Sequence, residues 1–279
     1  MKKLSATMTL QNADTVPYLT FDFLKEISFI NHAFSTRLGG VSEGEFTSMN
    51  TAFNRGDDPD RVTENYRRLC QSAGFDFNSL VASAQDHHTY VRAVTAADRG
   101  VGIYKPRDLD SVDALITDES GVTLVTYYAD CTPLFFVDVK RRAIGLAHAG
   151  WRGTVGRIGE KVIEKMTALY GTDPKDIVAA VGPAVSVCCY EVDEPCAAQF
   201  LALEGLDSGK FVFPKEGGKY MVDLLETNRQ ILVAAGVPES SITLSDLCTN
   251  CNSDLLWSHR ATNGHRGTMS AFLALKADS

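Results

Sequence analysis

Two histidines and one cysteine lie in segments whose residue types favour ligand binding. His148 opens HAGWRG at residues 148–153, which joins a buried strand to an amphipathic helix. Glycine lets the main chain approach a ligand there, and the amino end of a helix suits an anion. Cys131 ends the segment ADC after a β-branched strand, and the third residue is His87 or its neighbour His88. Taken singly, each also has a structural interpretation, as a packed turn, a buried free cysteine or a surface histidine.

Together, two histidines and one cysteine form a ligand set typical of catalytic zinc, which keeps three protein ligands and leaves a fourth position open. Adjacent residues of a strand point to opposite faces, so we expect only one of His87 and His88 to join Cys131 and His148. The long separations along the chain leave the geometry of such a site open.

A second cysteine motif, CTNC at residues 248–251, contains a single C-x-x-C pair. A structural zinc site needs a second pair of ligands, and the other cysteine cluster, Cys188-Cys189, lacks the spacing of a zinc knuckle. We therefore expect these cysteines to be buried or weakly redox-active. The basic, glycine-containing segment at residues 259–267 either lines an anion pocket or forms a solvated loop.

The composition favours a globular protein that acts on small molecules. The chain has 279 residues, of which 44% are hydrophobic and 22% charged, enough for a large buried core. A net charge of −8 argues against nucleic acid as a partner, and no apolar run has the length of a membrane span or a signal peptide. Seven cysteines in such a chain predict a reducing, cytoplasmic setting.

The elements that must position these residues mix strands and helices. β-Branched and aromatic runs predict strands at residues 122–128, 134–137, 143–147 and 177–181, with a hairpin turn at 138–142. Apolar residues at helical spacing predict helices at residues 59–73, 154–169 and 223–235. The fold class is therefore α/β or α+β with mixed sheets. Residues 1–20 are expected to form an extension or an edge strand, and residues 21–279 one catalytic domain.

Several segments together resemble the YfiH-like family, also called the polyphenol oxidase or laccase-domain family, whose members are now regarded as purine nucleoside phosphorylases. The resemblance rests on HAGWRG at 148–153 and ADCTP at 129–133, the most specific pair. It also rests, in chain order, on STRLGGVS at 35–42, GDDP at 56–59 with Asn65, QDH at 85–87, GPA at 182–184 with YEV at 190–192, and SHR at 258–260.

The resemblance implies that His87, Cys131 and His148 hold a catalytic zinc. It implies phosphorolysis of adenosine, inosine, guanosine and methylthioadenosine, together with adenosine deamination. It also implies a single α/β domain with mixed sheets flanked by helices, like the catalytic domain of certain deamidating toxins. The sequence departs from the family pattern at His88, where a small residue is usual, and at NGHRGT, residues 263–268.

For these activities we expect purine nucleosides and phosphate as partners. Zinc would activate a water for attack on C6 of adenine, with Asp130 moving protons beside Cys131 and His148. Arg37, Arg152 and Arg260 are candidates to hold phosphate, because each lies in a matching segment.

Three rival functions stay open: two are other enzymes, and the third is a non-catalytic protein that binds nucleosides or a partner. Cys131 could act as a nucleophile with His148 as its base, which would give an amidohydrolase that edits peptidoglycan precursors. A copper polyphenol oxidase needs histidines for several copper centres, and six histidines without an H-x-H pair argue against it.

Overall fold

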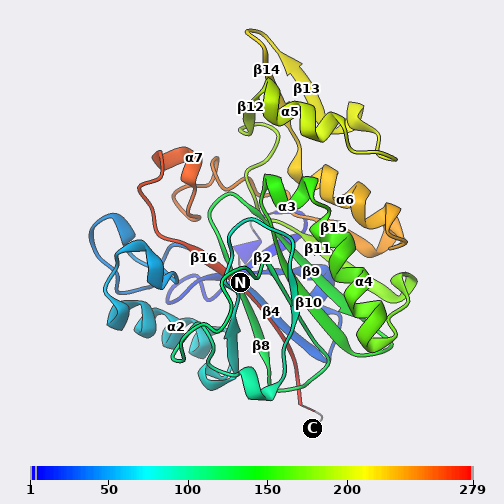
Figure 1. Ribbon diagram of the computed structural model, residues 1–279. Helices are drawn as coiled ribbons and strands as arrows, with labels where there is room; N and C mark the ends of the chain where they lie inside the picture. The colour runs from blue at the N-terminus through cyan, green and yellow to red at the C-terminus, as the bar shows by residue number, and fades with distance from the viewer. Residues whose placement is uncertain (1, 4, 278–279) are drawn as a thin grey trace.

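Two β-sheets packed face to face form the centre of the molecule, and helices cover their outer faces (Figure 1). The computed structural model describes residues 2–3 and 5–277. The first sheet has seven strands, antiparallel except for the β5–β8 pair, in the order β1 (Lys2–Lys3), β2 (Met8–Gln11), β3 (Tyr18–Phe21), β4 (Ile30–Ser35), β16 (Met269–Leu275), β8 (Thr123–Tyr128) and β5 (Leu80–Ala82).

The second sheet has six strands and carries parallel pairs at both edges, β11–β15 and β6–β7. Its order is β15 (Ile242–Leu244), β11 (Ile177–Val181), β9 (Thr132–Asp138), β10 (Ala143–Ala149), β7 (Ala114–Thr117) and β6 (Val91–Ala93). The helices are α1 (Asp22–Lys25), α2 (Pro59–Ala73), α3 (Trp151–Val155), α4 (Ile158–Tyr170), α5 (Glu194–Leu201), α6 (Leu224–Ala234) and α7 (His259–Thr262).

The central strands are apolar on both faces because each face meets a different layer. Phe135 and Val137 of β9 pack into the core between the two sheets, whereas Leu134 and Phe136 pack toward α4 and α6. Side chains alternate along a strand, so this pattern produces the continuous apolar run seen in the sequence. On the opposite side, Tyr66 of α2 covers the first sheet. The mixed α/β fold class is confirmed.

Most of the predicted elements are present. Helix α2 begins after Asp58, whose side chain accepts a hydrogen bond from the Asp60 N–H, and ends at Gly74 with a positive φ of 73°. Strand β11 has the predicted bounds, and β9 and β10 form the predicted hairpin. Helix α6 begins after Asp223, which caps the Glu226 N–H, as its sequence predicted.

The prediction of one helix across residues 154–169 was wrong. The chain forms α3 and α4, separated at Gly156 and Arg157, where Arg157 adopts a left-handed φ of 56°. Leu169, the last residue of the predicted helix, is 53% exposed. The short helix α3 instead begins at Trp151, three residues after His148, and carries Trp151 and Arg152.

The N-terminal segment and a small lobe extend this framework. Strand β1 is the edge strand of the seven-stranded sheet, and β2 and β3 follow it, antiparallel to each other and next to β4. The division at residue 20 stays a prediction, and Met1 and Leu4 lie outside the described residues. Strands β12 (Glu191–Asp193), β14 (Lys219–Val222) and β13 (Val212–Lys215) form an antiparallel sheet that projects with α5 from the main body (Figure 1).

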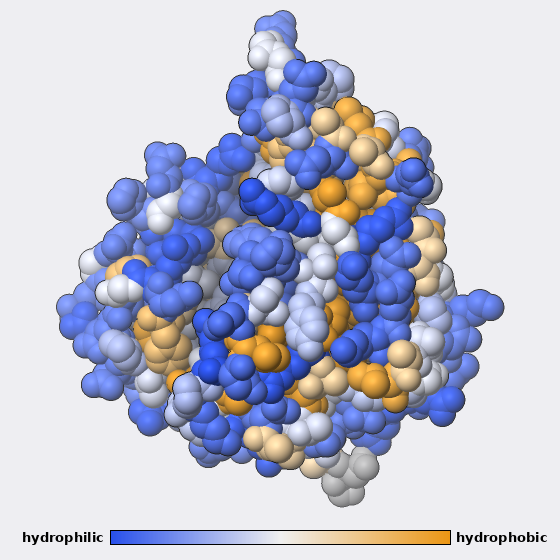
Figure 2. Space-filling view, viewed as in Figure 1, coloured by the Kyte–Doolittle hydropathy of each residue, from blue (hydrophilic) through white to orange (hydrophobic). Residues whose placement is uncertain are grey.

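Hydrophilic residues cover most of the face in Figure 2, apart from apolar areas that include one at the base of the small lobe. Within the described residues, no helix has both the length and the apolar character needed to cross a membrane.

Candidate metal centre

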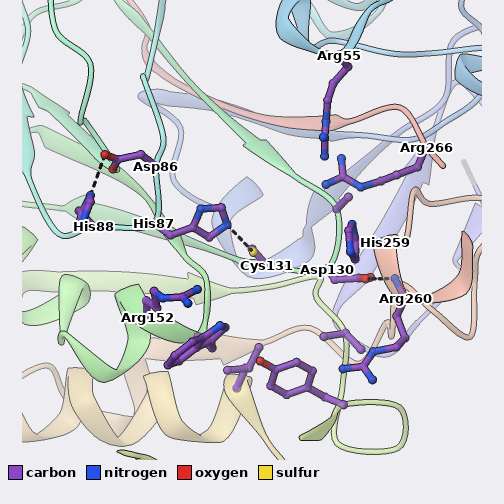
Figure 3. A pocket seen from close by; sticks show the side chains of 15 residues that line it. Arg55, Asp86, His87, His88, Asp130, Cys131, Arg152, His259, Arg260 and Arg266 are labelled. Atoms are coloured by element: carbon purple, nitrogen blue, oxygen red, sulfur yellow. Dashed lines mark hydrogen bonds and ion pairs between the residues drawn. The ribbon is translucent and has the colours of Figure 1, made fainter. Parts of the chain in front are cut away.

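The three residues predicted as metal ligands converge at one end of the sheet pair. His148 lies in β10, Cys131 in the turn between β8 and β9, and His87 in the loop between β5 and β6. The β9–β10 register places Thr132 opposite Ala149, so Cys131 lies beside the end of β10. The three ligand atoms lie within 4.8 Å of one another, and His87 Nε2 is 4.0 Å from Cys131 Sγ (Figure 3).

A buried carboxylate, which no sequence motif singled out, holds both histidines in place. Asp113 is fully buried and its Oδ1 lies 2.7 Å from His148 Nδ1. The same carboxylate accepts hydrogen bonds from the backbone N–H groups of Asp86, His87 and His88. With Nδ1 engaged, Nε2 of His148 is the nitrogen left to bind a metal, as in carboxylate–histidine–metal triads.

The structure places His87 and His88 on opposite sides of their loop. His87 adopts a left-handed φ of 70° and points its ring toward Cys131, while His88 pairs with Asp86 at 2.8 Å and is 71% exposed (Figure 3). The two residues lie in a loop and not in the strand that the alternation argument assumed. The geometry favours His87 over His88 as the ligand. Binding of a metal ion at this site stays a proposal.

Gly150 leaves room for the ligand cluster. A Cβ atom at this position would lie 2.9 Å from His87 Cδ2 and 3.1 Å from Cys131 Sγ. Its φ of −66° is open to any residue, so space and not backbone conformation requires glycine here. Gly150 therefore leaves the space that lets His87 and Cys131 approach each other.

The surroundings of Cys131 favour its thiolate form at neutral pH even without a metal. Burial raises the pKa of the Cys131 thiol, but His148 and His87 outweigh that effect and lower the pKa to about 6. Burial lowers the pKa of His148, and the Cys131 thiolate and Asp113 raise it to about 9. A thiolate beside an imidazolium therefore occupies the site between these values, and a thiolate is the form that binds metals or attacks electrophiles.

This charge state predicts an unusual pH profile for alkylation of Cys131 in metal-free protein. The iodoacetamide rate at Cys131, followed by peptide mass spectrometry, should rise around pH 6 and level off above about pH 7. The half-buried Cys196 is the internal control, because burial raises the pKa of its thiol and its rate should still climb above about pH 8. Matching profiles for the two cysteines would contradict the ion pair.

The donor set suits a transition metal. Two imidazole nitrogens and one thiolate with a free fourth side match catalytic zinc, and the same donors occur in mononuclear copper sites. Gly150 and the Asp113 hydrogen bonds show a site shaped around these donors. His87, Cys131 and His148 would hold the ion, and two of these residues, His87 and Cys131, line the adjoining cavity.

That cavity, of about 630 Å³, has the size of a pocket for a small ligand. His87 and Cys131 also line a smaller cavity of about 260 Å³, so the two spaces meet at the ligand cluster. The larger cavity has an aromatic and aliphatic wall and a cationic rim. Its lining residues are Arg55, Asp86, His87, His88, Ala129, Asp130, Cys131, Trp151, Arg152, Val185, Tyr190, Leu224, His259, Arg260 and Arg266.

Two of the three arginines predicted to hold phosphate lie at this cavity. Arg152 stacks on Trp151 at 4.2 Å, and Arg260 lies over Tyr190 and donates to the Glu191 carbonyl. Arg37 lies elsewhere: its guanidinium stacks on the buried Trp257 at 3.8 Å and donates to the Ser253 carbonyl. The structure therefore gives Arg37 a packing role outside the cavity.

Two other arginines meet at the cavity instead. Arg55 and Arg266 extend toward each other, and both line the larger and the smaller cavity (Figure 3). Burial and the charge of Arg55 lower the pKa of Arg266 to about 10. The buried Arg266 Nε has no hydrogen-bond partner in the part of the chain that the structure describes. Arg55 directly precedes the matching segment GDDP at residues 56–59, so choosing arginines from within the matching segments missed it by one residue.

Asp130 also lines the cavity, but both of its carboxylate oxygens bind neighbouring loops. Oδ1 accepts from the Thr249 hydroxyl at 2.6 Å, and Oδ2 accepts from the Arg260 N–H at 2.7 Å. Its φ of 85° directs the side chain into these contacts. Asp130 therefore fixes the cavity wall, and its expected role in proton transfer stays a prediction.

Known proteins are similar to this chain over the whole region that forms the cluster and the cavity. A family model described as multi-copper polyphenol oxidoreductase laccase matches residues 31–276. The purine nucleoside phosphorylase YlmD of Geobacillus stearothermophilus is 38% identical over 254 residues, covering 88% of this chain and 89% of that protein. A purine nucleoside phosphorylase of Deinococcus radiodurans is 40% identical over 246 residues, with the same two coverages of 88% and 89%.

A solved structure shows the same fold. The crystal structure of the hypothetical protein YfiH from Bacillus licheniformis matches with a TM-score of 0.89 at 33% identity, over 96% of this chain and 99% of that chain. The residues of the ligand cluster and of the cavity wall all fall inside the region that the family model matches.

Proposed function

Because the chain belongs to the multi-copper polyphenol oxidoreductase laccase family, and relatives in it are named purine nucleoside phosphorylases, we propose that it cleaves purine nucleosides with phosphate. One observation of the structure supports this most strongly. A histidine–cysteine ligand cluster, an aromatic wall and a pair of arginines surround two adjoining cavities. The proposal makes the protein a transferase that moves a ribosyl group from a purine to phosphate.

We propose zinc as the metal of His87, Cys131 and His148. Bound zinc would supply Lewis-acid activation of water or of a substrate oxygen. The residues of the chain position this centre: Asp113 fixes the His148 tautomer, and the backbone bonds of Asp113 fix the loop of His87. An activated water would also allow deamination of adenosine, which we include in the proposal.

The arginine pair fits the second substrate. Phosphate carries charge that must be held near the anomeric carbon of the ribose while the purine leaves. Arg266 provides a partly buried guanidinium and Arg55 an exposed one beside it, and both could make charge-assisted hydrogen bonds to the anion. Their mutual repulsion is relieved when an anion binds between them. We therefore propose these two arginines as the phosphate site, with Arg152 and Arg260 further along the rim.

The remaining wall fits the nucleoside base. Trp151, Val185, Tyr190 and Leu224 form an apolar side of the cavity, suitable for packing against a purine ring. His259 lies in the same cavity and burial lowers its pKa, so it is neutral near pH 7 and able to donate or accept a hydrogen bond. Adenosine, inosine, guanosine and methylthioadenosine share the ring that this wall would hold, and we propose all four as substrates in a reducing, cytoplasmic setting.

The proposal is tested by incubating zinc-loaded protein with these four nucleosides, with and without phosphate, and separating the products by chromatography. We expect free purine and a ribose 1-phosphate only when phosphate is present, and inosine from adenosine in either case. Purine release that does not depend on phosphate would indicate a hydrolase and contradict the phosphorylase assignment. Absence of any turnover by the metal-loaded protein would contradict an enzyme acting on nucleosides.

One feature favours a second candidate, the amidohydrolase. Asp113, His148 and Cys131 form a carboxylate–imidazole–thiolate series, which is also the arrangement of a cysteine nucleophile and its base. Two measurements separate the two roles. If Cys131 is a ligand, Cys131→Ala loses a stoichiometric zinc, and bound zinc protects Cys131 from alkylation. If Cys131 is a nucleophile, neither effect is expected. We do not propose multi-copper oxidation, since the cluster gathers two histidines around one position.

A further inference from the structure

Four cysteines from two distant segments converge outside the cavity. Cys188 and Cys189 lie in the turn between β11 and β12, and Cys248 and Cys251 lie in the loop after β15. Their sulfur atoms are all within 4.8 Å of one another. Of the two expectations, buried or weakly redox-active, burial holds for Cys248 and not for Cys188 and Cys251, which are exposed. The second pair that the C-x-x-C motif lacked in sequence is thus supplied by the fold.

The sulfur separations match those around a tetrahedral metal. A Zn–S bond of about 2.3 Å implies sulfur–sulfur edges of about 3.8 Å in a regular tetrahedron. Here Sγ of Cys188 lies 3.6 Å from that of Cys189 and 3.7 Å from that of Cys251, and the Cys189–Cys251 separation is 3.4 Å. We propose that Cys188, Cys189, Cys248 and Cys251 bind a structural zinc ion.

Hydrogen-bond donors around the sulfurs support thiolate ligands. The Ser186 N–H donates to Cys248 Sγ at 3.4 Å, and the Asn250 side-chain amide donates to Cys189 Sγ at 3.2 Å. Donors of this kind compensate the negative charge that four thiolates place on one metal. Four protein ligands leave no open position, so the ion holds structure and does not act on substrate.

The site would join two loops that form the wall of the cavity. Ala184 and Cys248 form an isolated parallel bridge, and the Thr249 N–H donates to the Ala184 carbonyl. Thr249 also holds Asp130, the neighbour of Cys131, and Tyr190 follows the cysteine pair and lines the cavity. A zinc ion across the four sulfurs would fix both loops relative to each other and thereby fix this wall.

The test separates this ion from the one proposed at His87, Cys131 and His148. Protein carrying Cys131→Ala, purified under reducing conditions, is expected to retain one zinc per chain by plasma mass spectrometry. Adding Cys188→Ser and Cys251→Ser should reduce that content to near zero, whereas adding Cys196→Ser, at a cysteine outside the cluster, should leave it at one. Circular dichroism shows whether each variant is folded.

A second measurement uses the Cys131→Ala protein without further substitution. Titration with an organomercurial in the presence of a zinc-sensitive dye should release one zinc as four thiols react, and replacement by cobalt(II) should give the visible spectrum of tetrahedral thiolate coordination. Absence of zinc from this protein, iron in its place, or disulfides among the four cysteines would overturn the proposal. None of these readouts depends on nucleoside turnover.

Discussion

Replacement of Cys131 by alanine is expected to remove one zinc per chain and to lower kcat/KM for inosine phosphorolysis by about 10³-fold or more. The thiolate is one of three ligands in the cluster, and its loss leaves two imidazoles as donors. A metal that stabilises charge in the transition state contributes several kcal/mol, and about 4 kcal/mol corresponds to about 10³ in rate. Zinc content and steady-state kinetics measured on the same preparation check this.

Cys196→Ala is the matched control, because Cys196 is also partly buried but lies outside both cysteine-containing clusters. It should keep its zinc content and its rate within about twofold. An enzyme that uses Cys131 as a nucleophile would also lose activity in Cys131→Ala. The zinc content therefore distinguishes the ligand role from the nucleophile role. A Cys131→Ala protein that is inactive but keeps all of its zinc would contradict the ligand role, and one that retains phosphorolysis would contradict any role.

Local patterns predicted those elements whose ends are fixed by neighbours in the chain. The start of α2 depends on Asp58 and Pro59, and its end on Gly74, so short-range chemistry sufficed. The break between α3 and α4 depends on tertiary contacts. A Cβ at Gly156 would lie 2.7 Å from Thr89 Cγ2, a residue outside the helix, so helical spacing alone could not reveal that packing constraint.

The same distinction applies to the site. His148 and Cys131 could be proposed from sequence because each lies in a recognisable strand-end segment. Asp113 could not, because its role depends on meeting His148 and three backbone N–H groups of another loop. The sequence shows only an aspartate directly before the apolar run at residues 114–116, a place where a charged side chain that becomes buried needs a partner. The pairing of Cys188-Cys189 with CTNC likewise depends on two loops that only the fold brings together.

The arginines show most clearly where sequence patterns stop being informative. Membership of a matching segment marked Arg37 as strongly as Arg152, yet the fold stacks Arg37 on Trp257 and leaves Arg266 with an unpartnered buried nitrogen among the described residues. Whether a guanidinium is already engaged is decided by residues far away in the chain. Substitutions of Arg37 and Arg266 should therefore differ in their effect on phosphate binding.

Arg266→Gln is expected to raise the KM for phosphate by about 10- to 100-fold while changing the KM for inosine by less than about threefold. Hydrogen bonds to a charged group contribute about 1.5–3 kcal/mol each, which corresponds to this range. Burial and Arg55 lower the pKa of Arg266 to about 10, so the guanidinium remains protonated at neutral pH. Initial rates over a matrix of phosphate and inosine concentrations separate the two KM values.

Two further variants serve as controls: Arg266→Lys keeps the charge at the proposed phosphate site, and Arg37→Gln removes an arginine outside it. Arg266 also donates to the Gly267 carbonyl and the Thr268 hydroxyl, so a loss of loop structure must be separated from a loss of charge. Lysine keeps the charge but not the planar fork, and should restore part of the phosphate affinity. Arg37→Gln removes a guanidinium outside the cavity and should leave the phosphate KM within about threefold. If Arg37→Gln weakens phosphate as much as Arg266→Gln, the anion is held elsewhere and the cavity rim is not its site.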